Sequence, residues 1–147
     1  MSTKRKSKPK PEALYQLTLT HTQAWTLRNL CELAARLGMG QLDRLAEYLP
    51  HPNDTFPPRF LKKEIEALQS RWRVQYFGLD DERASWGAGQ VAQDASVAWD
   101  LYTCIRHRLA HDLREETGDT HWGVDLYEPD NTARSPVMAK IVRMQPE

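Results

Sequence analysis

The segment that most constrains the fold is residues 91–113, where apolar side chains recur at steps of three and four residues: Val91, Ala95, Ala98, Tyr102, Ile105 and Leu109. This spacing places them on one face of an α-helix and predicts a long amphipathic helix at the centre of the core. A chain of 147 residues is large enough for one such core and too small for two. We therefore expect a single folded domain over residues 13–147.

Three more helices are predicted upstream. Thr20 followed by Gln23 forms a capping box, so a helix should begin at His21 and end near Gly38 and Gly40. A shorter helix should follow, with its leucines inward, and end before Pro50. A third helix is expected over residues 59–77, with an inward stripe made of Phe60, Ile65, Leu68, Trp72 and Tyr76.

Strands are predicted at both ends of the folded part. The stretch "ALYQLTLT" (residues 13–20) alternates apolar and polar residues, as does "HWGVDLYEP" (121–129), and "PVMAKIVRM" (136–144) is a further candidate. We expect these terminal strands to pair in a small sheet on which about four helices pack. The predicted fold class is therefore α+β.

Charge is distributed unevenly along the chain. Residues 1–12 hold five of the twenty basic residues and one acid, which leaves 15 basic and 19 acidic residues in 13–147. The first twelve residues lack an apolar run and should form a disordered basic arm. Such an arm can contact nucleic acid through phosphates or serve only as a solubilising tail, and both interpretations stay open.

Composition also bounds the location and the chemistry. No apolar stretch approaches the ~20 residues of a membrane span, and no apolar run follows the basic start as in a signal peptide. We therefore expect a cytoplasmic protein without a membrane partner. Cys31 and Cys104 both lie in apolar-periodic segments and should be small buried residues in a reducing compartment. No cofactor is predicted.

The stretch "IRHRLAHD" (residues 105–112) resembles the active-site motif of the HEPN ribonucleases, in which an Arg precedes a His by five positions. The match falls on Arg106, His107 and His111. The resemblance implies metal-independent RNA cleavage at a dimer interface, where a guanidinium stabilises negative charge and an imidazole moves protons. That family consists of helical bundles, and the predicted strands argue against membership. The alternative is an ordinary solvated helix face.

His107 and His111 also share a helix face at a spacing that can chelate zinc, with His121 as a candidate third ligand. Position 108 holds an Arg where a zinc-protease helix carries its Glu, and this cation opposes metal binding. We therefore predict no metal site.

A broader resemblance covers about residues 14–141. The stretches "YQLTLTHTQAWTL", "RLGMGQLDRLAEYL", "ASWGAGQ", "AWDLYTCIRHRLAHD" and "GVDLYEP" are similar, in this order, to those of a family of small bacteriophage-encoded proteins. The resemblance implies a phage or prophage protein in the cytoplasm of a bacterial host. By analogy with other small phage proteins, we expect a non-catalytic binding module that occupies a host component, such as a defence system, or sequesters a nucleotide signal.

Two groups of residues are candidates for the binding surface. A loop with acids beside an aromatic residue suits a basic host protein: Asp80, Asp81, Glu82 and Trp86. A cationic helix segment that meets Trp86 would instead suit a phosphorylated ligand in a pocket shared between subunits: Arg106, His107 and Arg108. We expect a host protein as partner, with a phosphorylated ligand, nucleic acid and ribonuclease activity as alternatives.

Overall fold

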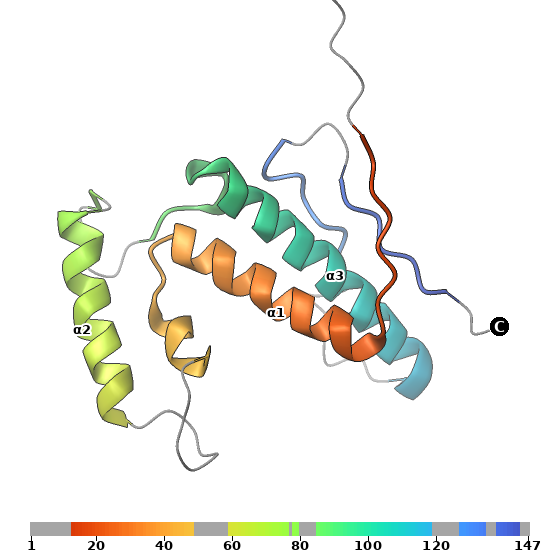
Figure 1. Cartoon of the computed structure of the whole chain (residues 1–147), viewed down its shortest axis with the longest axis horizontal. Helices are drawn as coiled ribbons and strands as arrows, with labels where there is room; N and C mark the ends of the chain where they lie inside the picture. The colour runs from red at the N-terminus through yellow and green to blue at the C-terminus, as the bar shows by residue number, and fades with distance from the viewer. Residues whose placement is uncertain are drawn as a thin grey trace, which may run out of the picture.

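The computed structural model describes residues 13–48, 59–76, 78–79, 85–118, 127–134 and 138–144. Its elements are, in order, α1 (His21–Gly38), the 3₁₀-helix η1 (Asp43–Tyr48), α2 (Arg59–Gln75), the 3₁₀-helix η2 (Ala88–Gln90) and α3 (Gln93–Thr117). Figure 1 shows α1 and α3 packed side by side and running in opposite directions. Helix α2 stands at one end of this pair and packs against η1.

Helix α1 begins as its capping box predicts. The Thr20 hydroxyl accepts a hydrogen bond from the Gln23 amide at 3.3 Å, and the Gln23 side chain accepts one from the Thr20 amide at 2.9 Å. The helix ends at Gly38, where an added Cβ would lie 2.4 Å from the Cβ of Ala95. Only glycine therefore allows the end of α1 to approach the start of α3 this closely.

Helix α3 confirms the long helix predicted for residues 91–113, but it begins at Gln93, so Val91 precedes it. Of the predicted stripe, Ala95, Tyr102, Ile105 and Leu109 are buried, and Tyr102 and Ile105 are the largest fully buried side chains described. The helix continues to Thr117 and ends at Gly118, whose φ of 70° is the left-handed conformation that glycine adopts readily. The α1·α3 pair is thus the main packing unit of the described chain.

The predicted stripe of α2 is mostly wrong. Ile65 is buried with Leu42 and Ala46 in a small core, but Leu68 and Trp72 are each 38% exposed. Polar side chains of α2 are buried instead. The side-chain oxygen of Gln69 accepts hydrogen bonds from the backbone amides of Leu42 and Asp43 at the start of η1. Backbone amides at a helix start need acceptors, and this need turns a polar face of α2 inward.

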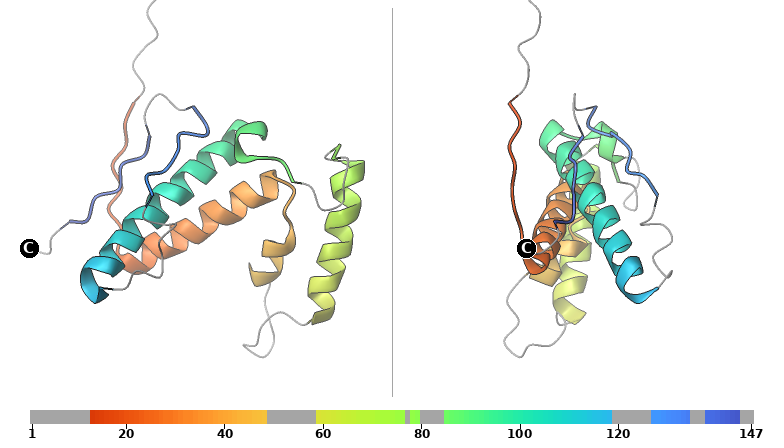
Figure 2. Two further views of the ribbon diagram at one scale, coloured as in Figure 1. Left: turned by 180° about the vertical axis from the view of Figure 1, so that it is seen from behind. Right: turned by 90° about the vertical axis from the view of Figure 1, so that its right-hand side faces the viewer.

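The α+β prediction is wrong, because no strand or sheet occurs in the residues that the structure describes. Residues 13–20 are extended (Figures 1 and 2). Their side chains are exposed, among them Leu14, Tyr15 and Leu17. Residues 138–144 are not a strand either, and no backbone hydrogen bond between described residues joins the two segments. Residues 121–126 of the other predicted strand lie outside the described residues. Alternation indicates that a segment can form a strand, but a strand also requires a partner.

Residues 127–134 and 138–144 lie beside α3 (Figure 2), and side-chain contacts tie both segments to that helix. The buried carboxylate of Asp100 accepts hydrogen bonds from the amides of Thr132 and Ala133 at 3.0 and 2.9 Å. Farther along, Arg143 pairs with Glu116 at 2.8 Å. Among the described helices, none combines the length and the apolar character needed to cross a bilayer.

Candidate functional site

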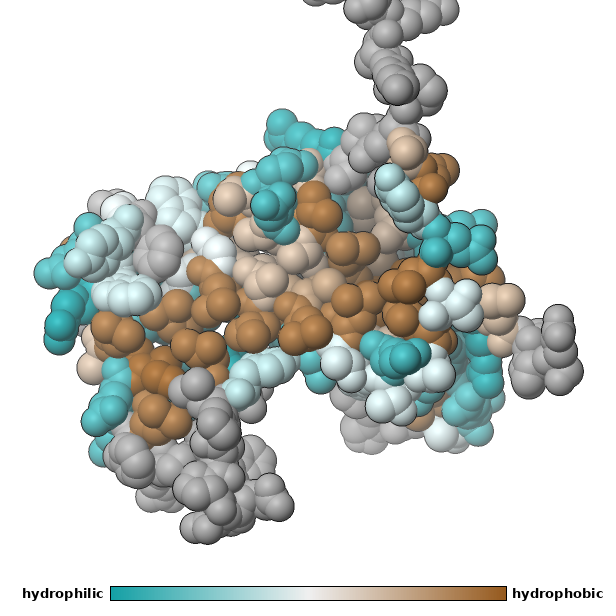
Figure 3. Space-filling model, in the orientation of Figure 1, coloured by the Kyte–Doolittle hydropathy of each residue, from teal (hydrophilic) through white to brown (hydrophobic). Residues whose placement is uncertain are grey.

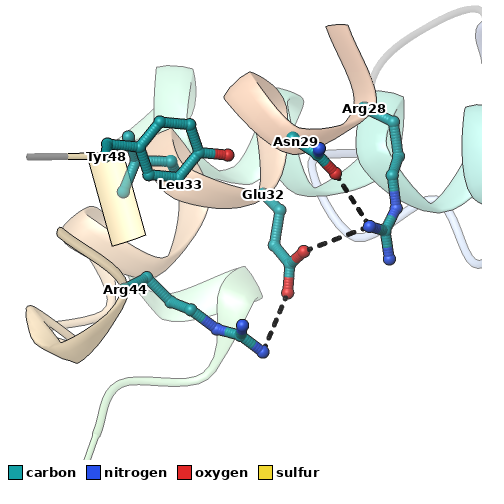
Figure 4. Close-up of a pocket in the computed structure, with 6 residues that line it drawn as sticks. All are labelled: Arg28, Asn29, Glu32, Leu33, Arg44 and Tyr48. Atoms are coloured by element: carbon teal, nitrogen blue, oxygen red, sulfur yellow. Dashed lines mark hydrogen bonds and ion pairs between the residues drawn. The ribbon is translucent and has the colours of Figure 1, made fainter. Parts of the chain in front are cut away.

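A cleft of about 370 Å³ opens between α1 and η1 (Figure 4). Its volume lies within the range of small-molecule sites. It is lined by Arg28, Asn29, Glu32, Leu33, Arg44 and Tyr48. The first four of these residues belong to α1, whose first turn is fixed by the capping box at Thr20. Arg44 and Tyr48 belong to η1, whose start is held by hydrogen bonds to the Gln69 side chain.

Glu32 lies at the centre of the charges around the cleft. Its carboxylate is 2.8 Å from Arg36 Nε, 3.7 Å from Arg44 Nη2 and 3.8 Å from Arg28 Nη1. Three guanidinium groups therefore lie around one carboxylate. Among the side chains that line the cleft, two are arginines and one is a glutamate.

Arg28 is held in place by aromatic rings. Its guanidinium carbon lies 5.3 Å from the centroid of the Trp25 ring and 5.1 Å from that of Tyr102. It also donates to the Asn29 side-chain oxygen at 2.8 Å, and Nη2 lies 3.5 Å from the Tyr102 hydroxyl. Its Nε is buried and makes no hydrogen bond. Cation–π contacts on two sides fix the orientation of this guanidinium.

Arg106, which the sequence predicted as a site residue, belongs to the same cluster. It donates to the Tyr102 hydroxyl at 2.8 Å, and its guanidinium carbon lies 5.5 Å from the centroid of that ring. Tyr102 therefore connects Arg106 of α3 with Arg28 of α1. Arg106 does not line the cleft and reaches Arg28 only through the Tyr102 hydroxyl. The predicted binding face of Arg106 and Arg108 is therefore not part of the cleft.

The other motif residues of α3 have different neighbours. The rings of His107 and His111 meet edge to face, with centroids 4.6 Å apart. Arg108 pairs with Asp112 one turn later. In an α-helix a separation of five residues turns two side chains about 140° apart. Within one chain, Arg106 and His111 therefore do not converge.

Trp86, the described residue of the predicted loop site, does not join this cluster. Trp86 is half-buried, and its amide donates to the Met39 carbonyl at the end of α1 at 3.2 Å. Arg106 lies about 20 Å along α3 from Gln93, the first residue of that helix, at a rise of roughly 1.5 Å per residue. The three acids of the loop, Asp80, Asp81 and Glu82, lie outside the described residues.

Sequence reasoning missed the cleft, although one signal was available. Arg28, Glu32 and Arg36 follow one another at four-residue spacing, which places all three on one helix face as an ion-pair ladder. The contributions of Arg44 and Tyr48 had no comparable signal. They reach the cleft because the turn after Gly38 brings η1 back against α1.

Both cysteines are buried, as predicted. Burial raises the pKa of the Cys31 thiol. Burial also raises the pKa of the Cys104 thiol, with further contributions from the negative charges of Asp100 and Glu128. Within the described ranges, no three His, Cys, Asp or Glu side chains are grouped so as to hold a metal ion. His121, the predicted third zinc ligand, falls outside them.

A second surface feature is apolar. Figure 3 shows a band of apolar surface that runs along α1 and reaches η1 and α2. Exposed apolar side chains on these three elements include Leu30 (49%), Leu45 (36%) and Leu68 (38%). Contiguous apolar surface of this kind is typical of protein-binding faces.

Comparisons with protein-family models, with curated proteins and with solved structures found no match for this chain.

Proposed function

We propose that this protein is a non-catalytic binding module whose cleft between α1 and η1 takes a small phosphorylated ligand. The observation that carries the proposal is the shared carboxylate of Glu32, which faces three guanidinium groups. Guanidinium groups bind phosphate oxygens through paired hydrogen bonds and stay charged at every relevant pH.

The three arginines are suited to different tasks. Arg28 is held between Trp25 and Tyr102, so it loses little side-chain entropy when a ligand binds. The Arg44 side chain is 38% exposed and lies 3.7 Å from Glu32 at the edge of the cleft. We therefore expect Arg28 to orient the phosphate and Arg44 to close on it.

The resemblance to phage-encoded proteins gives this proposal its biological setting. A phage protein that binds a host metabolite stoichiometrically would sequester it in the host cytoplasm. The basic arm of residues 1–12 lies outside the described residues, and its contact with nucleic acid stays a separate prediction.

Titration calorimetry with inorganic pyrophosphate tests the binding proposal. Wild type should bind it, and Arg44→Gln should bind it at least tenfold more weakly. Arg71→Gln is the matched control, because Arg71 is an exposed arginine of α2 away from the cleft. Equal affinity in wild type and Arg44→Gln would contradict the proposal, as would the absence of binding at low ionic strength.

The apolar band favours a second candidate, the binding of a partner protein. Because residues 13–147 are mildly acidic, the partner expected is a host protein with an apolar patch rimmed by basic residues. In this case the double variant Leu30→Glu with Leu45→Glu should lose a protein that wild type and Arg44→Gln both retain from bacterial lysate. Retention of that protein by wild type and both variants would argue against the apolar band as the binding surface.

The ribonuclease alternative loses the objection from its fold, since the described residues form no sheet. It still requires Arg106 and His111 from two chains, because the two side chains diverge within one. Metal-independent RNA cleavage that both His111→Ala and Arg106→Lys abolish would favour it. Circular dichroism of both variants excludes loss of the fold as the cause.

A further inference from the structure

Two extended segments expose apolar side chains beside the α1·α3 pair. Residues 13–20 and 138–144 contain no helix or strand, and Figures 1 and 2 show them side by side. Tyr15 is 95% exposed. Apolar groups gathered in this way mark a binding surface. The exposed apolar side chains of the two segments are Leu14, Tyr15, Leu17, Leu19, Ile141, Val142 and Met144.

The two segments contain basic residues but no acid. Residues 13–20 are uncharged, and the first turn of α1, which follows them, has no acidic residue either. In the second segment Lys140 is exposed, and Arg143 pairs with Glu116 of α3 at 2.8 Å, which compensates that carboxylate. Directly before residue 13 the sequence adds five basic residues and one acid. Apolar side chains are thus combined with positive charge.

This combination fits an anionic lipid surface. Aliphatic side chains gain free energy at the boundary of the acyl chains, and lysine side chains gain it near anionic headgroups. Nucleic acid would attract the basic residues, but its phosphates and stacked bases offer little to leucine, isoleucine or valine. A second copy is also a poor fit. Antiparallel pairing of residues 13–20 would place the basic start of each chain beside the positive N-terminal end of the other chain's α1.

We infer that residues 13–20 and 138–144 together bind the anionic face of a lipid bilayer. Their apolar side chains enter the boundary between headgroups and acyl chains, and Lys140 lies at the headgroups. A protein needs no spanning helix to bind a bilayer in this way. The sequence predicted no membrane partner because it lacks a spanning stretch, and the exposed segments revise that prediction. This surface shares no residue with the cleft, so it is independent of the phosphate site.

Co-sedimentation of the full chain with lipid vesicles tests the inference. One set of vesicles contains phosphatidylcholine alone, and the other contains equal parts of phosphatidylcholine and the anionic phosphatidylglycerol. Wild type should bind the mixed vesicles at least tenfold more tightly, because each basic residue near an anionic surface contributes about fivefold. Tyr15→Ser with Leu17→Ser should weaken this binding at least tenfold, since burial of one leucine side chain contributes about 10- to 150-fold.

Two further variants separate the apolar contribution from charge and from general surface effects. Tyr76→Ser with Val74→Ser is the matched control, because it removes an exposed tyrosine and an exposed aliphatic side chain from α2. It should bind both kinds of vesicle as wild type does. Lys140→Gln should weaken binding to the mixed vesicles about fivefold.

Binding to the mixed vesicles that Tyr15→Ser with Leu17→Ser leaves unchanged would overturn the inference, because charge alone would then explain it. Equal binding to both kinds of vesicle, or binding to neither, would also overturn it. Sedimentation without lipid identifies the other occupants. A wild-type dimer that the Tyr15 and Leu17 double variant does not form would assign the segments to a second copy. A complex with double-stranded DNA that only this double variant loses would assign them to nucleic acid.

Discussion

Removal of one oxygen atom, in Tyr102→Phe, tests the link between the two helices. The hydroxyl accepts a hydrogen bond from the Arg106 guanidinium at 2.8 Å and lies 3.5 Å from Arg28, at the outer limit for such a bond. A hydrogen bond to a charged group contributes about 1.5–3 kcal/mol to stability, and removing one partner loses this contribution. The phenyl ring stays in its buried site, so the cavity term is small. We expect the free energy of unfolding to fall by about 1.5–3 kcal/mol.

Urea denaturation followed by circular dichroism measures this loss. Tyr76→Phe makes the same chemical change at a residue that is 74% exposed and should stay within about 0.5 kcal/mol of wild type. The reasoning also predicts a functional result: without the hydroxyl Arg28 loses a contact that orients it, so pyrophosphate should bind more weakly. A loss below about 0.5 kcal/mol in Tyr102→Phe would refute the link between Arg28 and Arg106.

Three further predictions follow from buried groups of the α1·α3 pair. Ile105→Ala should lower the free energy of unfolding by about 2–5 kcal/mol in urea denaturation, because Ile105 is 2% exposed; Val74→Ala, at a residue 48% exposed, should cost less than about 0.5 kcal/mol. Asp100→Asn leaves one of two backbone amides without its carboxylate acceptor, so limited proteolysis should cut residues 127–134 faster than in wild type. Because burial raises the pKa of Cys31 and Cys104, the unfolded chain loses thiol protons before the folded chain as the pH rises. Stability measured by urea denaturation should therefore fall above about pH 9, and a double Cys→Ala variant should lose this part of the pH dependence.

Local signals were sufficient for the helices. The capping box at Thr20 predicted the first residue of α1, since both of its hydrogen bonds lie within four residues of sequence. The apolar period of residues 91–113 predicted α3 and its buried face, because one long helix repeats the same pattern over several turns.

The same reasoning failed where a contact joins distant parts of the chain. Residues 13–20 alternate as a strand does, yet pairing depends on a second segment that their own sequence does not specify. In α2 the buried positions are partly Gln69 and Arg73, whose partners are backbone groups of the turn near Gly40. A pattern search that counts apolar residues cannot find a polar side chain that is buried because a helix start needs an acceptor.

The candidate site divides in the same way. The sequence by itself determined that Arg28, Glu32 and Arg36 share one face of a helix, because the helical repeat of 3.6 residues aligns every fourth position. Only the tertiary structure decided that Arg44 and Tyr48 of η1 stand opposite that face and that Tyr102 connects Arg28 to Arg106. The physical reason is the separation in the chain: Arg28 and Tyr102 are 74 residues apart, and their contact exists only because Gly38 lets α1 and α3 pack closely.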